Sequence, residues 1–487
     1  MAEVSPTAST ERTDESAGGF GSLGSILFLL ILAWTALLAV RPLNDNSFLT
    51  HLATGRLILE DGSVPSADPY TYTAGGEPWT VQSWLASVGY AAAESLGGAV
   101  GLRLFIAAIF GCAAVLLWKL SAPARSLVPR LLIMAVAMTV ASSVWSERPY
   151  MTGFIGLALV WLALDGRVPN WTLIPYMWLW VNSHGSYPLA VALCIAVIAG
   201  RAADERRLAV NDLRHELHVL AAVLGGAALG VLSPLGFRAL TFPVQAVTRS
   251  ERFGLIAEWQ APEFTSIFER AFLLLALLAV AGVISRQRWR DALPLLLFLA
   301  AGLVARRNMV MALPVLVAVA SGAVPPFGTL RSSSRPKGGQ LLAVPLGALV
   351  VVIIAAGIQG PHLALGDYPI RALAHVQDVA GAQRIVSQDY TGNLLEALDG
   401  PSGSVFVDDR ADMFPPAVFD DYVTLNRASR GWFQVLDRYE TAIVVWDSTH
   451  PLATVLAASP DWQITYSDAG WIVALRRDGT AQVKRAP

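Results

Sequence analysis

Between residues 23 and 358 the chain alternates long apolar segments with short polar ones. The first segment, residues 23 to 40, carries no charge. At a rise of about 1.5 Å per residue it nearly spans the roughly 30 Å hydrocarbon layer of a bilayer. Further apolar segments lie at residues 101 to 118, 127 to 145, 151 to 164, 171 to 182, 187 to 200, 215 to 232, 271 to 285, 291 to 305, 309 to 324 and 341 to 358. The pattern predicts an α-helical polytopic membrane protein with about eleven transmembrane helices.

Composition supports this interpretation. Hydrophobic residues make up 54% of the chain and charged residues 15%, with a mean hydropathy of +0.51. A water-soluble fold of this composition would be coated with apolar surface. The net charge of -2 indicates no nucleic-acid partner. Cys112 and Cys194 lie within apolar segments, where a disulfide framework is improbable. Residues 1 to 22 have too few basic residues for a signal peptide and are interpreted as a disordered cytoplasmic tail.

Basic residues concentrate in the loops at one end of the apolar segments. These loops carry Lys119, Arg125, Arg130, Arg167, Arg201, Arg206, Arg207, Arg214, Arg286, Arg288, Arg290, Arg331, Arg335 and Lys337. Such a bias marks the cytoplasmic side, so the N-terminus is predicted inside and the C-terminal part outside. The linker at residues 325 to 340, rich in Pro, Gly, Ser and basic residues, is then a cytoplasmic loop that could touch anionic lipid.

The first loop on the outer side, residues 41 to 100, is too long for a simple connector. Apolar residues recur at helical spacing between residues 46 and 59, and Gly62 ends the pattern. After a proline-rich turn that contains Asp68, residues 79 to 96 predict a second amphipathic helix. Its Trp and Tyr side chains favour the headgroup layer of the membrane.

Asp45 lies a few positions beyond the first apolar segment, near the mouth of any cavity that the helices enclose. A carboxylate there could take a proton from an acceptor hydroxyl group, since burial can tune the pKa of a general base. The alternative is a helix N-cap for the segment that starts near Asn46. His51 could assist or merely pack; no metal-ligand spacing surrounds it, and a divalent cation stays open.

Further polar residues fall at the outer ends of other predicted helices. They are Glu147, Arg148, Asn182, His184, Glu258, Arg306 and Arg307. Polar groups at membrane depth are costly and mark a pathway or a site, so these residues predict a cavity shared with Asp68 and His51. The three arginines break the charge bias. Either they bind a phosphate, which suits guanidinium geometry, or they pair with acids such as Glu147 or Glu258.

Residues 361 to 487 change character and predict a small α/β domain outside the membrane. Its expected elements are strands at 384 to 388, 405 to 409, 442 to 446, 463 to 466 and 472 to 475, a helix at 416 to 426, and a hairpin turn at 468 to 470. The order permits parallel pairing. Asp408, Asp409 and Arg410 follow a strand, and they either grip a polar acceptor or form an internal ion pair.

Several stretches together carry a resemblance to a known family. They are residues 45 to 56 (DNSFLTHLATGR), 62 to 73 (GSVPSADPYTYT), 78 to 86 (PWTVQSWLA), 147 to 149 (ERP), 180 to 185 (WVNSHG), 258 to 260 (EWQ), 306 to 308 (RRN), 405 to 413 (VFVDDRADM) and 432 to 439. With these, the chain resembles the GT-C superfamily of polytopic glycosyltransferases, and looks closest to a bacterial branch whose activities are mostly unassigned. Members of the superfamily take sugars from polyprenyl-phosphate donors on the outer side of the membrane.

The resemblance implies a catalytic base in the first outer loop, and Asp45 occupies the matching place. The branch often has a second acid two positions later, followed by aromatic residues. Here Ser47, Leu49 and Thr50 stand there instead. The absence of this second acid counts against metal binding and against catalysis by the first outer loop.

Two functions are expected from these features. The first is transfer of a hexosyl or pentosyl group from a polyprenyl-phosphate donor to a glycan, lipid or protein acceptor of the bacterial cell envelope. Asp45 would act as base, and Arg148, Arg306 or Arg307 would neutralise the leaving phosphate, with no soluble cofactor required. The second is a non-catalytic assembly factor that binds a lipid-linked glycan or an envelope protein. A solute transporter ranks last, because neither internal repeats nor charges at mid-membrane are clear.

Overall fold

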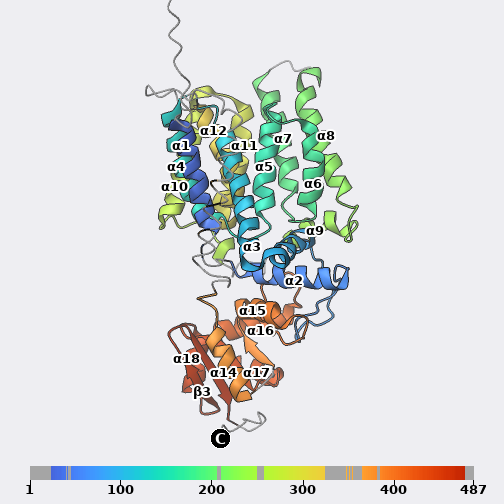
Figure 1. The fold of residues 1–487 in the computed structure, drawn as a ribbon, viewed down its shortest axis with the longest axis vertical. Helices are drawn as coiled ribbons and strands as arrows, with labels where there is room; N and C mark the ends of the chain where they lie inside the picture. Colours follow the sequence, from blue (N-terminus) through green and yellow to red (C-terminus); the bar gives the residue numbers. More distant parts are fainter. Residues whose placement is uncertain are drawn as a thin grey trace, which may run out of the picture.

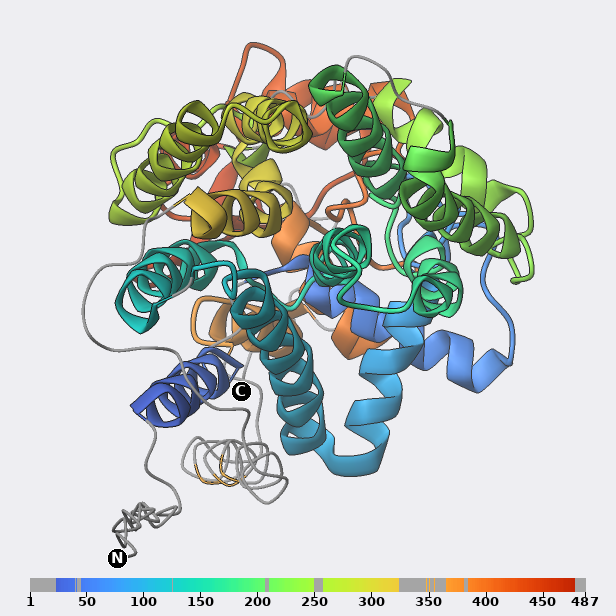
Figure 2. The ribbon, with the colours of Figure 1, turned by 90° about the horizontal axis from the view of Figure 1, so that it is seen from above.

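The computed structural model describes residues 23–39, 41, 45–124, 126–205, 210–248, 257–323, 347, 350, 354, 365–380 and 384–477. The predicted N-terminal tail, the linker at 325 to 340 and nearly all of the last predicted segment, 341 to 358, lie outside these residues. A helical bundle forms one end of the molecule and a small α/β domain the other (Figure 1). Viewed from above, the bundle helices stand side by side, with the C-terminal domain beneath them (Figure 2).

The bundle follows the apolar pattern of the sequence closely. Its helices are α1 (Leu23–Ala39), α3 (Trp84–Leu120), α4 (Leu127–Val144), α5 (Met151–Leu164), α6 (Leu173–Val181), α7 (Pro188–Asp204), α8 (Arg214–Leu229), α10 (Ile267–Arg286), α11 (Trp289–Val304) and α12 (Met309–Ala323). Among the described helices, α3, α4 and α10 are long and apolar enough to cross a membrane, by length and composition. The structure therefore supports a membrane-embedded bundle but does not establish eleven spans.

Two predicted bundle elements differ from those observed. The helix predicted over residues 79 to 96 begins only at Trp84 and continues through the next apolar segment as the single helix α3. The helix is kinked at Gly97 and Gly98. Gly98 adopts a φ of 57° and a ψ of -145°, a backbone conformation that residues other than glycine avoid. The segment at 171 to 182 yields only nine α-helical residues, because its first turn is the 3₁₀ helix η1 (Asn170–Thr172).

Helix α2 (Ser47–Asp61) confirms the first helix predicted in the outer loop. It lies across the end of the bundle, between the bundle and the C-terminal domain (Figure 1). Gly62 ends it with a φ of 65°, and the Gly62 N–H donates to Ile58 O at 3.0 Å. Gly55 lets α2 approach α3 closely, since a Cβ atom on Gly55 would lie 1.9 Å from the carbonyl oxygen of Ser87.

We expect Gly55→Ala to lower the stability of the folded protein by about 1–3 kcal/mol, because the added methyl group must push two backbones apart. Thermal unfolding of the purified protein measures the effect. Gly111→Ala is the matched control, since Gly111 lies in α3 and a Cβ there meets nothing within 4 Å. Equal melting temperatures for the two variants would contradict the tight α2–α3 contact.

The C-terminal domain contains a four-stranded sheet of order β1-β2-β4-β3. Strands β1 (Ile385–Ser387) and β2 (Ile443–Asp447) pair in parallel, whereas β4 (Trp471–Arg476) pairs antiparallel with β2 and with β3 (Trp462–Ser467). The predicted hairpin between the last two strands is confirmed. Its helices are α14 (Ile370–Ala380), α15 (Asp389–Asp399), α16 (Pro416–Asn426), α17 (Trp432–Arg438) and α18 (Pro451–Ala458).

The strand predicted at residues 405 to 409 is wrong. Val405 instead forms an isolated parallel bridge with Thr71 of the first outer loop. The Tyr72 N–H donates to Val405 O at 3.0 Å, and the Val405 N–H donates to Tyr70 O at 3.3 Å. An apolar run reports burial but not its partner, and here the partner is a loop some 330 residues earlier in the chain. 

The hydrophobic core of the C-terminal domain also includes the first outer loop. Tyr70, Trp79 and Val81 are buried in the same cluster as Val405 and Phe406. On the bundle side, Thr50 of α2 donates to Asn393 Oδ1 of α15 at 3.0 Å. This shared core fixes the start of α2 against residues 408 to 410, where the candidate site lies.

Candidate functional site

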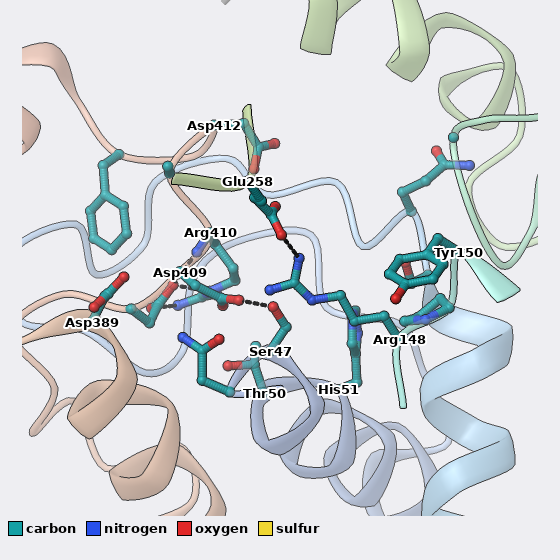
Figure 3. A pocket seen from close by; sticks show the side chains of 18 of the residues that line it. Ser47, Thr50, His51, Arg148, Tyr150, Glu258, Asp389, Asp409, Arg410 and Asp412 are labelled. Carbon is teal, nitrogen blue, oxygen red and sulfur yellow. Dashed lines mark hydrogen bonds and ion pairs between the residues drawn. The ribbon is translucent and has the colours of Figure 1, made fainter. Parts of the chain in front are cut away.

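A cavity of about 1250 Å³ lies where the bundle, the first outer loop and the C-terminal domain meet. Its walls come from α2, from the loops that follow α4 and α6, from the segments before α10 and α12, and from the C-terminal domain. Figure 3 shows Arg148 near the middle of this space, with Tyr150 on one side and Asp409 and Asp389 on the other. Most of its polar lining belongs to segments far apart in sequence, as the predicted shared cavity requires.

Arg148 is the most strongly paired cation of the cavity. Its Nε lies 2.5 Å from Asp45 Oδ1, and its Nη1 lies 2.7 Å from Glu258 Oε2. Burial disfavours the guanidinium charge, but Asp45, Glu258 and Asp409 outweigh that effect and hold the pKa of Arg148 above its ordinary value. The pairing with Glu258 is the ion pair that the sequence left as an alternative to phosphate binding.

Asp45 pairs with Arg148 but is not among the residues that line the cavity. Besides Arg148, it accepts hydrogen bonds from the Ser47 N–H at 3.1 Å and from Ser146 Oγ at 3.0 Å. The hydrogen bond from Ser47 ties Asp45 to the start of α2, but the N-cap position is Asn46 and not Asp45. Asp45 therefore orients both α2 and Arg148.

The two neighbouring arginines that the sequence grouped together point to different places. Arg307 lines the cavity, stacks 4.2 Å over the ring of Trp259 and contacts Glu258 Oε1 at 3.4 Å. Arg306 is not among the lining residues; its Nε lies 2.8 Å from Glu269 Oε1 of α10. The structure thus brings Arg148 and Arg307 together around Glu258 and leaves Arg306 outside.

Two histidines lie on the cavity wall as neutral imidazoles. Burial and the charge of Arg148 lower the pKa of His51 to about 4. Burial, Arg307, His51 and Arg148 lower the pKa of His184 to about 3. His51 Nδ1 lies 3.3 Å from Ser87 Oγ, and His184 Nδ1 lies 2.8 Å from Ser186 Oγ. At neutral pH they can exchange hydrogen bonds with a ligand without adding charge.

Asp409 contributes a carboxyl group to the cavity wall. Burial raises its pKa to about 7, while Arg148 and the hydrogen bond donated by Ser47 Oγ oppose that rise. Its N–H donates to Asn393 Oδ1 at 3.2 Å, which anchors the loop. A carboxyl group that titrates near neutral pH suits proton transfer at physiological pH.

Asp408 and Arg410 form the internal ion pair that the sequence offered as an alternative to acceptor binding. Arg410 Nε lies 2.9 Å from Asp408 Oδ1, and Arg410 Nη2 lies 2.7 Å from Asp68 Oδ1 of the first outer loop. Glu396 Oε1 is 3.3 Å from the same nitrogen. Asp68 is buried in this cluster and is not among the lining residues.

Two other predicted cavity residues also lie outside the wall. Asn182 is fully buried; its Oδ1 accepts from Trp84 Nε1 at 3.0 Å and its Nδ2 donates to Trp178 O at 2.9 Å. It therefore joins the end of α6 to the start of α3. Glu147 is 2% exposed and is not among the residues that line the cavity, whereas its neighbour Arg148 is.

Sequence reasoning missed one end of the cavity. Gln388, Asp389, Tyr422, Asn426 and His450 line it near the C-terminal sheet. A usable signal existed, because Asp389 directly follows a correctly predicted strand and ligands favour the carboxyl ends of parallel strands.

The donor set does not fit a bound metal ion. Over the described ranges, no group of three or more His, Cys, Asp and Glu side chains is arranged to hold one. Of the carboxyl groups that line the cavity, Glu258 pairs with Arg148 and Arg307, and Asp408 pairs with Arg410.

Comparison with known proteins identifies the fold. No protein-family model matches the chain, and no curated protein is similar to it in sequence. Among solved structures, it is similar to the Archaeoglobus fulgidus oligosaccharyltransferase tethered to an acceptor peptide with the NVT sequon. The identity is 13% and the TM-score 0.50, over 86% of this chain and 69% of that one.

A second similar structure is the A. fulgidus oligosaccharyltransferase AglB in complex with an inhibitory peptide and a dolichol-phosphate. Here the identity is 12% and the TM-score 0.51, with the same coverage. Identities this low show the fold alone. The bacterial branch suggested by the sequence stays a prediction. The chain shares the fold of these two oligosaccharyltransferase structures.

Proposed function

We propose that this protein is a membrane glycosyltransferase that moves a sugar from a polyprenyl-phosphate donor to an acceptor of the cell envelope. The observation that carries this proposal is one cavity lined by Arg148, Arg307 and the carboxyl group of Asp409, whose pKa is raised to about 7. The fold supports it, and the AglB structure holds a dolichol-phosphate, which is an isoprenoid phosphate. The protein would work in the bacterial plasma membrane with the C-terminal domain outside.

Arg148 and Arg307 are the groups proposed to bind the donor phosphate. Guanidinium groups match phosphate oxygens in charge and geometry. Arg307 is the more available of the two, because its contact with Glu258 is 3.4 Å long whereas Arg148 makes two ion pairs of 2.5 and 2.7 Å. As the phosphate leaves, their fixed positive charges stabilise the charge that develops on it. Arg306, paired with Glu269, is not assigned to the phosphate.

Asp409 is the proposed general base in place of Asp45. Its carboxylate takes the proton from an acceptor hydroxyl while the acceptor oxygen forms a bond to the anomeric carbon of the sugar. The bond from that carbon to the phosphate oxygen breaks, and the electron pair leaves with the polyprenyl phosphate. The proton held by Asp409 then passes to solvent.

The departure of the first loop from the resemblance fits this assignment. Ser47 stands where the branch often has a second acid, and Ser47 Oγ is hydrogen-bonded to the carboxylate of Asp409. The C-terminal domain thereby places a carboxylate at the position that the first loop lacks. The assembly-factor function keeps support from the same substitution, because a cavity without chemistry needs no base.

Mass spectrometry of lipids retained by the purified protein tests the proposal without a guess about the sugar. We expect a polyprenyl phosphate or its glycosylated form, lost in Arg307→Ala and accumulated in Asp409→Asn. Asp45→Asn is measured beside them. Arg306→Ala is the matched control, since Arg306 pairs outside the cavity. A protein that retains other lipids but no polyprenyl phosphate would favour the assembly factor.

The orientation proposed from charge predicts opposite accessibility for two engineered cysteines in intact cells. In a background lacking Cys112 and Cys194, we expect Ser66→Cys in the first outer loop to react with a membrane-impermeant maleimide. Ser333→Cys in the linker should react only after the cells are opened. Ser66 is exposed, so its side chain is reachable from solvent. The reverse labelling would place the cavity on the cytoplasmic side.

A further inference from the structure

One end of the cavity forms a polar lobe at the carboxyl ends of the parallel strands β1 and β2. We define the lobe by Gln388, Asp389, Tyr422, Asn426 and His450. Gln388 and Asp389 directly follow β1, and His450 lies three residues beyond the end of β2. Tyr422 and Asn426 come from α16 one helical turn apart, which places them on the same face. In a sheet with parallel strands, this edge is where ligands bind.

The side chains of the lobe are held in place by one another. Gln388 Nε2 lies 2.6 Å from His450 Nδ1, which in turn lies 3.0 Å from Asn426 Oδ1. Gln388 Oε1 accepts from the Asp447 N–H at 2.9 Å. Tyr422 OH donates to Asp389 Oδ1 at 3.1 Å. Polar groups fixed in this way meet a ligand with little further loss of conformational freedom.

These contacts leave further hydrogen-bonding capacity. Within the described parts of the chain, Asp389 Oδ2, Asn426 Nδ2 and His450 Nε2 have no hydrogen-bond partner. They represent an acceptor, a donor and a group that can be either. Phe419, three residues before Tyr422 on α16, also lines the cavity and adds an aromatic surface. Mixed donors and acceptors beside aromatic rings match a sugar, whose hydroxyl groups donate and accept and whose C–H faces are apolar.

The position of the lobe suits an acceptor. The lobe and the two arginines line the same cavity. Figure 3 places Asp389 at the side opposite Tyr150, with Asp409, Ser47 and Arg148 between them. A molecule bound in the lobe would therefore meet a donor held at Arg148 and Arg307 beside Asp409.

We propose that the lobe is an acceptor subsite for carbohydrate, so that the protein extends a glycan rather than modifying a peptide. This inference rests on the proposed function, which supplies the donor. A peptide acceptor is recognised largely through its backbone, by pairing with an exposed strand edge or with backbone groups. The groups available in this lobe belong to side chains instead.

Saturation-transfer NMR on the full-length protein in nanodiscs tests the proposal. The probes are neutral di- and trisaccharides of glucose, galactose, mannose and arabinose, with an Asn-Val-Thr tripeptide measured in parallel. We expect at least one saccharide to bind and the tripeptide not to. Asn426→Ala and His450→Ala should each weaken saccharide binding by about tenfold, the effect of losing one buried hydrogen bond.

Two further variants distinguish a loss of saccharide binding from a loss of folding. Tyr422→Phe keeps the aromatic ring and removes only the hydroxyl that positions Asp389. Thr424→Ala lies on the same helix, outside the cavity lining, and should bind saccharides as the unchanged protein does. Binding of the tripeptide alone, binding of no probe, or saccharide binding that survives Asn426→Ala, His450→Ala and Tyr422→Phe would overturn the proposal.

The experiments distinguish an error in the acceptor-subsite proposal from an error in the proposed function. Retention of the polyprenyl lipid does not involve the lobe, so Asn426→Ala should retain it fully. Saccharide binding without any retained polyprenyl phosphate would support the lobe and refute the transferase. A retained polyprenyl phosphate without saccharide binding would support the transferase and refute the lobe.

Discussion

Asp409→Asn is expected to lower the rate of sugar transfer by about 10²–10⁴-fold, the contribution of a general base. Binding of the donor should persist, because Arg148 and Arg307 remain. The assay is transfer from the polyprenyl lipid identified in the purified protein, reconstituted in vesicles. Asp45→Asn should act differently: it releases one of the two carboxylates that hold Arg148, and so should weaken donor retention. A larger loss of the transfer rate in Asp45→Asn than in Asp409→Asn would show that Asp45, and not Asp409, is the general base.

The pH dependence gives a second readout of the same residue. A base must be deprotonated, so the rate should rise with pH through about 7, the pKa of Asp409, and then level off. The hydrogen bond from Ser47 holds this pKa down. Ser47→Ala should therefore move the acid limb of the profile to higher pH. An unchanged profile in Ser47→Ala would contradict the assignment.

Stability should respond to pH in the opposite sense. The pKa of Asp409 is about 7 in the folded protein, whereas the ordinary pKa of an aspartate, which applies to the unfolded chain, is 3.8. The folded state thus holds a proton that the unfolded state has released. Its contribution is fully present below about pH 4 and is lost as pH rises through 7. Asp409→Asn should flatten this decline in melting temperature, independently of any substrate.

Arg410→Met is expected to lower the stability of the C-terminal domain and of the loop packed on it by about 3–5 kcal/mol, the cost of removing one partner of a buried ion pair. The guanidinium of Arg410 forms ion pairs with Asp68, Asp408 and Glu396, and all four side chains are at most 7% exposed. It also lies 4.3 Å from the ring of Trp79. Burial and Asp408 raise the pKa of Glu396 well above its ordinary value, and the charge of Arg410 opposes that rise.

Thermal unfolding and limited proteolysis of the first outer loop measure this loss. Arg430→Met is the matched control, since Arg430 is an exposed arginine of the same domain and should change stability by less than about 0.5 kcal/mol. Adding Asp68→Asn and Asp408→Asn to Arg410→Met should recover part of the loss, because two of the three buried carboxyl groups that lose their cationic partner are then replaced by amides. A single variant as stable as the unchanged protein would show that the cluster does not join the loop to the domain.

The sequence by itself determined the bundle, much of the sheet and where the cavity would be sought. Apolar length and spacing are local properties, so α5 and α16 were predicted to the residue, as were the α2 helix stop at Gly62 and the final hairpin. Arg148 and Glu258 were recognised because charges beside a membrane are costly wherever the chain folds.

The tertiary structure alone decided which polar groups meet. Residues 405 to 409 read as a strand, but their partner is the loop around Thr71, and no local pattern reports a partner so far away in sequence. Arg306 and Arg307 are adjacent and chemically alike, yet only Arg307 enters the cavity, because neighbouring side chains leave a helical turn in different directions. Asp409 accepts a hydrogen bond from Ser47, which lies 362 residues earlier in the chain. Its pKa near 7 is set by burial between two parts of the chain, which exists only once they have packed together.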